Sequence, residues 1–213
     1  MKQLRIISLI CALCLFLSAC ASQQPEDGSS TEPPNTVRIT IPEGASAADI
    51  GGLMEQNGLF TRSEFLAEVN RGNADSPLVQ EIGDWENRAF LLEGYLFPET
   101  YEFYRDESHE RVIQKLMDNL EKKITGTQKA RAKEFDMTMD EVLTLASIIQ
   151  AEAGDPAQMK TVSSVLHNRL NSKSHPKLEC DVTIFYLEQE VQPYLTEDKD
   201  RFNSFYNTYK CTG

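Results

Sequence analysis

Two helices that meet at a corner are the strongest structural signal in this 213-residue sequence. Thr138, followed three residues later by a glutamate, matches a capping box and predicts that a helix begins there. Apolar residues then recur at helical spacing until Gly154, which is expected to end the helix. Asp155-Pro156 supplies an N-cap and a first-turn proline, so a second helix should begin at once. The sequence therefore predicts a helix, a corner and a second helix over residues 138–171.

Glu152 lies on the predicted apolar stripe of the first helix, near the corner, whereas Gln150 does not. A carboxyl group on an apolar face is costly to ionise, so the pKa of Glu152 is expected to be raised. A raised pKa suits a proton donor near neutral pH. The alternative is a helix-end glutamate whose side chain reaches solvent and has no chemical role.

The N-terminus has the pattern of a removable secretion signal. Lys2 and Arg5 precede an apolar run over residues 6–17, too short for a bilayer span, which takes roughly 20 residues. The run ends in Leu-Ser-Ala before Cys20, which resembles the lipobox of bacterial lipoproteins, where the cysteine is lipidated. We expect residues 1–19 to be a lipoprotein signal peptide and the protein to be extracytoplasmic, lipid-anchored to the bacterial cell membrane. An ordinary secretory signal with an incidental cysteine is the alternative.

The rest of the chain divides into three parts. Residues 20–36 comprise the cysteine and a tail without large apolar residues, which is expected to be a disordered tether. Residues 37–72 have the pattern of one strand and two short helices. Residues 73–213 combine aromatic-rich strand segments around 90–103 with an amphipathic helix over 108–124 and the two corner helices. The predicted fold class is therefore α+β.

Composition and residue spacing exclude several classes of function. The chain has 33 Asp and Glu against 21 Lys and Arg, a net charge of −12, whereas nucleic-acid binding needs a basic surface. The sequence has no P-loop, dinucleotide fingerprint or zinc signature, and His109, His167 and His175 form no ligand pattern, so we expect no metal or cofactor. Cys180 and Cys211 could form a disulfide outside the cytoplasm; two free, buried thiols are the alternative.

Several short motifs follow one another along the chain. They are Leu92–Tyr101, Ala146–Ala153, Val165–Leu170, Leu178–Ile184 and Tyr206–Tyr209. Together they resemble the endolytic murein transglycosylase family, MltG or YceG-like. The resemblance implies cleavage of the MurNAc–GlcNAc glycosidic bond of peptidoglycan strands, leaving 1,6-anhydroMurNAc ends, in cell-wall assembly and remodelling. It also implies that the strand-helix-helix segment is a LysM-like subdomain and that the remainder is a YceG-like catalytic domain.

The same resemblance implies one catalytic glutamate in the first corner helix. Many relatives carry glutamate at the positions of both Gln150 and Glu152, so here the role is expected to fall on Glu152. One carboxyl group suffices because the MurNAc 6-hydroxyl is an internal nucleophile, whereas hydrolysis generally uses two carboxylates. Glu93, Glu99 and Asp181 are candidates for a second acid; satisfying backbone groups at chain breaks is the alternative for the first two.

Other polar and aromatic residues of the motifs are expected to bind substrate. The predicted set is Glu93, Tyr95, Asn168, Asp181, Thr183, Tyr206 and Asn207. Orienting Glu152 is the alternative for Asp181 and Thr183. Tyrosine rings, including those of Tyr186 and Tyr209, could stack on sugars, but core packing is the commoner fate of aromatic residues. A structural role at the end of the second corner helix is the alternative for Asn168.

Two features depart from the family pattern. Relatives commonly carry a transmembrane helix, whereas this chain looks lipid-anchored. The family also continues beyond the tyrosine motif, so the end at Gly213 predicts a C-terminally truncated catalytic domain. The expected partners are peptidoglycan strands, the membrane and, as further candidates, cell-wall synthesis proteins. A non-catalytic peptidoglycan-binding lipoprotein is the alternative function, and a lipid-anchored solute-binding protein is disfavoured by the short length.

Overall fold

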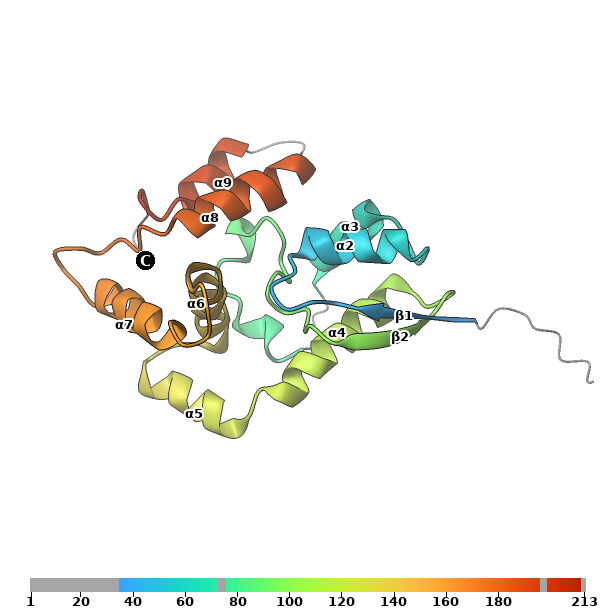
Figure 1. Ribbon diagram of the computed structural model, residues 1–213, viewed down its shortest axis with the longest axis horizontal. Helices are drawn as coiled ribbons and strands as arrows, with labels where there is room; N and C mark the ends of the chain where they lie inside the picture. Colours follow the sequence, from blue (N-terminus) through green and yellow to red (C-terminus); the bar gives the residue numbers. More distant parts are fainter. Residues whose placement is uncertain (1–34, 73–75, 196–198, 212–213) are drawn as a thin grey trace, which may run out of the picture. The chain divides into compact units, whose positions relative to one another are not determined.

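The computed structural model describes residues 35–72, 76–195 and 199–211 (Figure 1). The predicted signal peptide, the Cys20 lipidation site and nearly all of the predicted tether lie outside these described residues. Within them, none of the helices has the length and apolar character needed to cross a membrane.

The described chain is rich in helix and contains one small sheet, which confirms the predicted α+β class. The strands are β1 (Thr36–Thr40) and β2 (Thr100–Tyr104). The α-helices are α2 (Ala47–Gln56), α3 (Arg62–Arg71), α4 (His109–Lys123), α5 (Gly126–Glu134), α6 (Met139–Glu152), α7 (Met159–Leu170), α8 (Asp181–Tyr186) and α9 (Lys199–Tyr206). Short helical turns are η1 (Val79–Glu81), η2 (Trp85–Asn87), η3 (Leu187–Val191) and η4 (Gln192–Tyr194).

The sheet joins the N-terminal segment to the middle of the chain. β1 and β2 are antiparallel, with Thr36 opposite Tyr104 and Thr40 opposite Thr100 (Figure 1). Alternate side chains, such as Ile39 and Phe103, face one large core that α2, α3 and α4 also enter. Residues 37–72 therefore share both their sheet and their core with later residues, and their likeness to LysM stays a prediction.

Helix starts follow the sequence closely because capping is local. Ser46, Thr61 and Thr138 each form a complete capping box at the start of α2, α3 and α6. The corner after α6 differs in one respect from the expectation. The Asp155 carboxylate accepts the backbone N–H groups of the two following non-proline residues and caps a separate turn, so α7 begins only at Met159.

The N-terminal end of α6 is anchored by a buried charged group. Asp140, only 7% exposed, accepts hydrogen bonds from Arg88 Nη2 at 2.6 Å and from the Tyr95 hydroxyl at 2.7 Å. Burial and the neighbouring Asp140 raise the pKa of Tyr95, so its phenol stays a neutral donor. Next to this group, the Met139 N–H donates to Glu81 at 2.8 Å. These contacts fix the start of the helix whose last residue is Glu152.

Candidate active site

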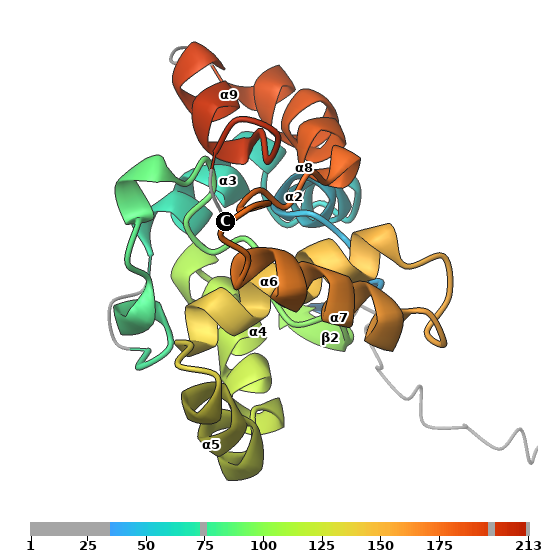
Figure 2. The same ribbon diagram turned by 90° about the vertical axis from the view of Figure 1, so that its left-hand side faces the viewer.

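A cavity of about 280 Å³ lies where the end of α6, one face of α7 and the start of the chain after Leu178 meet. Figure 2 shows α6 and α7 next to each other, and the two helices are in contact. The lining residues are Glu152, Thr161, Val162, Val165, Leu166, Arg169, Glu179 and Cys180. A small hydrophobic cluster consists of Leu145, Leu166, Leu178 and Cys180, and two of these residues, Leu166 and Cys180, also line the cavity. The predicted corner between two helices therefore does bring Glu152 into a cavity.

Glu152 is exposed, which fits the alternative of a helix-end glutamate that reaches solvent and not desolvation on an apolar face. The physical reason is its position as the last residue of α6: the small hydrophobic cluster extends along the helix only as far as Ile148 and Ile149. The apolar stripe predicted the direction in which the side chain points but not where the core ends.

Gln150 lies on another side of α6. Its Nε2 atom is close to the turn after β1, because a Cβ added to Gly44 would lie 3.4 Å from it. Gln150 does not line the Glu152 cavity. Of the two α6 positions considered for the catalytic acid, only Glu152 therefore faces the cavity.

Cys180 lies beside the Glu152 carboxylate at the base of the cavity. Its side chain is 3% exposed, and its burial, the negative charge of Glu152 and a hydrogen bond with that carboxylate raise the pKa of the thiol to about 11. Both Cys180 and Cys211 are free thiols, so the alternative without a disulfide describes the structure. The Sγ of Cys211 instead faces the end of α9, where it lies 3.2 Å from the Asn207 carbonyl oxygen.

The contact between the Glu152 carboxylate and the Cys180 thiol predicts a change in the titration of that thiol. In Glu152→Gln, the pKa of Cys180 should fall below about 11 because the negative charge that disfavours the thiolate is gone. It should stay above the ordinary cysteine value, because burial, the largest cause, remains. The measurement is the pH dependence of Cys180 alkylation, resolved by peptide mass spectrometry, with the exposed Glu188→Gln as control. An unchanged pKa in Glu152→Gln would show that the carboxylate does not lie beside the thiol.

Thr208 holds the cavity wall in place, and the sequence reasoning missed this role. Its hydroxyl accepts the Cys180 N–H at 2.8 Å and lies 3.1 Å from the Cys180 carbonyl oxygen. Its carbonyl accepts the Glu179 N–H at 3.2 Å, and Thr183 donates to the same Cys180 carbonyl at 2.9 Å. The only signal in the sequence was the position of Thr208 inside the Tyr206–Tyr209 motif.

Three other predicted substrate-binding residues do not line the cavity, although Asp181 directly follows its lining residue Cys180 in the chain. Asp181 is exposed and accepts a hydrogen bond from the Tyr209 hydroxyl at 2.8 Å. The Asn207 side chain accepts the Tyr209 N–H at 3.1 Å and so shapes the same turn. Asn168 is exposed on α7 but does not line the cavity. Sugar contact by these residues stays a prediction.

The remaining predicted residues are structural in this fold. Tyr95 is only 1% exposed and has no ring surface for a sugar, so its predicted stacking role was wrong and core packing describes it. Tyr206 accepts the Ala89 N–H at 3.1 Å through its hydroxyl and stacks on Tyr186 at 5.7 Å between ring centres. These rings hold distant segments together: Tyr95 lies in the main core, and Tyr186 and Tyr206 pack against it.

Glu93 is also bonded inside the protein. It accepts the Ala47 N–H at the start of α2 and the Tyr186 hydroxyl at 2.7 Å. Burial raises the pKa of Glu93, although hydrogen bonds from the Tyr186 hydroxyl and from the backbone N–H groups of Ala47 and Gly94 oppose that effect. Satisfying backbone groups was the alternative given for Glu93, and the geometry fits it; Glu99 is exposed at the start of β2 and does not line the Glu152 cavity.

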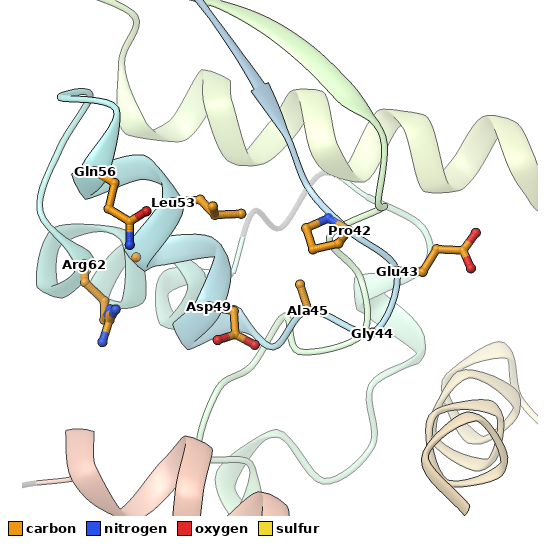
Figure 3. Close-up of a pocket in the computed structure, with 9 residues that line it drawn as sticks. Pro42, Glu43, Gly44, Ala45, Asp49, Leu53, Gln56 and Arg62 are labelled. Atoms are coloured by element: carbon orange, nitrogen blue, oxygen red, sulfur yellow. The ribbon is translucent and has the colours of Figure 1, made fainter. Parts of the chain in front are cut away.

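A second cavity, of about 400 Å³, lies beside the turn after β1 and against α2 (Figure 3). Asp49, Gln56 and Arg62 supply its polar atoms, while Pro42 and Leu53 supply apolar surface. The Arg62 side chain packs against α2 at Gly52, where an added Cβ would collide with the guanidinium. Across the described ranges, no group of His, Cys, Asp and Glu side chains could hold a metal ion.

Comparison with known proteins gives a consistent set of relatives. A family model described as the YceG-like family matches residues 23–213. An endolytic murein transglycosylase of Bacillus subtilis (strain 168) is 29% identical over 183 residues, which cover 83% of this chain and 50% of that protein. An endolytic murein transglycosylase of Streptococcus pneumoniae serotype 2 is 29% identical over 209 residues, 88% of this chain and 37% of that protein. This chain thus spans about half or less of the length of these curated relatives.

A solved structure supports the fold assignment. The crystal structure of a putative yceG-like protein from Listeria monocytogenes matches with a TM-score of 0.65 at 26% sequence identity. The match covers 83% of this chain and 60% of the Listeria chain.

Proposed function

The chain belongs to the YceG-like family, and we propose that it is an endolytic peptidoglycan lytic transglycosylase with Glu152 as its single acid–base group. The observation that carries the proposal is Glu152 at the end of α6, in a cavity that it shares with Arg169 and Glu179. The relatives that bear the name endolytic murein transglycosylase support the reaction class.

The proposed reaction uses one carboxyl group twice. Glu152, protonated, donates to the bridging oxygen as the bond between that oxygen and C1 of MurNAc breaks and GlcNAc leaves. The resulting carboxylate then accepts the proton of the MurNAc 6-hydroxyl as its oxygen bonds to C1. Glu152 ends protonated again, no water is consumed, and the strand ends in 1,6-anhydroMurNAc.

The rest of the cavity offers groups that suit a sugar chain. Arg169 and the Thr161 hydroxyl can hydrogen-bond hydroxyl or N-acetyl groups, and the exposed Val165 offers apolar surface to a sugar face. Asp181 and Tyr209 extend this polar surface beyond the Cys180 wall. We also propose that the protein is extracytoplasmic and carries a lipid on Cys20. The mass of the N-terminal peptide tests for the lipid.

The reaction is tested by the chemistry of the strand ends it makes. Purified glycan strands are digested with the full-length protein, and the products are separated and weighed by mass spectrometry. We expect fragments with 1,6-anhydroMurNAc ends released from within the strands. Anhydro ends are lighter than reducing ends by one water molecule, so the two outcomes are directly distinguishable.

Two other results would overturn the proposal in different ways. Reducing ends would mean that water attacks C1, as in a muramidase, which generally needs a second carboxylate. Binding of strands without any new ends would favour the alternative, a non-catalytic peptidoglycan-binding lipoprotein.

A further inference from the structure

Glu179 is the second carboxylate of the cavity that contains Glu152. It was not among the residues that the sequence suggested for a second acid, which were Glu93, Glu99 and Asp181. The Glu179 side chain is 45% exposed, so it is available to a molecule that enters the cavity. It directly precedes Cys180, whose thiol lies beside Glu152, and both carboxylates line the same cavity.

The backbone of Glu179 is in a conformation that glutamate rarely adopts. Its φ is 51°, and among the described non-glycine residues only Asp136 is also positive. A left-handed conformation is unfavourable for an ordinary L-residue, and only glycine adopts it freely. The conformation is held by the Glu179 N–H, which donates to the Thr208 carbonyl at 3.2 Å. Glycine would be unstrained at this position. The presence of glutamate there indicates that its side chain has a function, because strained residues cluster at active sites.

Arg169 does not form a hydrogen bond with the Glu179 carboxylate. The Arg169 Nη2 atom lies 3.9 Å from Glu179 Oε2, beyond hydrogen-bond distance, and both side chains are partly exposed. The other terminal nitrogen of the same guanidinium, Nη1, donates to the Leu178 carbonyl oxygen. An ion pair of this kind contributes little stability, so it does not explain the strained backbone. The Glu179 carboxylate lines the cavity, where its lone pairs can face a substrate.

We propose that Glu179 is a second catalytic carboxylate, which stabilises the positive charge that develops on the reacting MurNAc ring. This inference rests on the proposed function. Glycosidic bond cleavage passes through an oxocarbenium-like transition state, and a fixed negative group beside it stabilises that state more than the neutral ground state. Glu179 forms and breaks no bond: the proton still moves from Glu152 to the leaving oxygen, and the 6-hydroxyl still closes on C1.

The test is the turnover of glycan strands by the full-length protein with single substitutions at position 179. Glu179→Gln removes the charge and should lower kcat by about 10²-fold with KM changed little, as for loss of a transition-state electrostatic group. Glu179→Asp keeps the charge and should retain part of the activity. Glu179→Gly also removes the charge but relieves the backbone strain, so it should be at least as stable as wild type and as slow as Glu179→Gln. Glu188→Gln, an exposed carboxylate outside the cavity, is the matched control and should behave as wild type.

A binding measurement separates charge stabilisation from a merely structural role. The probe is 2-acetamido-1,2-dideoxynojirimycin, an iminosugar with a protonated ring nitrogen, compared with neutral N-acetylglucosamine. Glu179→Gln should bind the cation about tenfold more weakly and the neutral sugar unchanged.

The possible failures are distinguishable from one another. Wild-type kcat in Glu179→Gln, or equal weakening for both sugars, would overturn the role of Glu179 and leave the proposed function standing. A wild type that makes no new strand ends would overturn the proposed function and this role with it.

Discussion

Replacing Glu152 with glutamine is expected to lower the turnover of glycan strands by about 10²- to 10⁴-fold, the effect of losing a positioned acid–base group. Glutamine has nearly the same shape and can still accept a hydrogen bond from the Cys180 thiol, so the cavity should keep its form. It cannot give up or accept the proton that the leaving oxygen and the 6-hydroxyl exchange. The measurement is the rate at which new 1,6-anhydroMurNAc ends appear, at a strand concentration well above KM.

Two controls make this result specific. Glu188→Gln changes an exposed carboxylate that does not line the cavity and should leave the rate unchanged. Thermal unfolding of Glu152→Gln should match wild type, because Glu152 is exposed at the end of α6 and adds nothing to the core. A Glu152→Gln variant with the wild-type rate would mean that another group transfers the proton.

The local features of the fold were predictable from the sequence because their partners are close in the chain. A capping box joins two residues three positions apart, so Thr138 and Glu141 could be recognised directly. Helical spacing likewise predicted the direction in which the Glu152 side chain points. The start of α7 was less predictable, since Asp155 can cap either a helix or the short turn that it caps here.

Features that depend on distant partners were not predictable in this way. The strand at residues 36–40 was recognisable, but its pairing with β2 joins segments on either side of two helices. Tyr95 has the residue type of a sugar-binding aromatic, and only its burial and its hydrogen bond to Asp140 in the folded chain show that it is a core residue. Glu179 carried no signal beyond its place in the Leu178–Ile184 motif, because a positive φ and a shared cavity exist only in the folded chain.

Replacing Arg88 with methionine is expected to lower the free energy of unfolding by about 3–5 kcal/mol, the usual effect of leaving one partner of a buried ion pair alone. Arg88 and Asp140 are largely buried, with side chains only 18% and 10% exposed. Methionine keeps much of the apolar stem of arginine, so the loss should come mainly from the unpaired Asp140 carboxylate. Urea unfolding gives the free energy, and an unchanged slope against urea would show that the unfolded state is comparable.

The matched control is Arg131→Met, which breaks an ion pair with Glu134 in which the two side chains are 64% and 60% exposed. Such a surface pair contributes about 0–1 kcal/mol, so this variant should unfold almost as wild type does. Equal effects of Arg88→Met and Arg131→Met would contradict the anchoring of α6 through Asp140. If Arg88→Met lowers the free energy of unfolding much more than Arg131→Met does, the two ends of α6 have different functions. The buried pair at its start supplies stability, and the exposed carboxylate at its end is free for chemistry because the core does not depend on it.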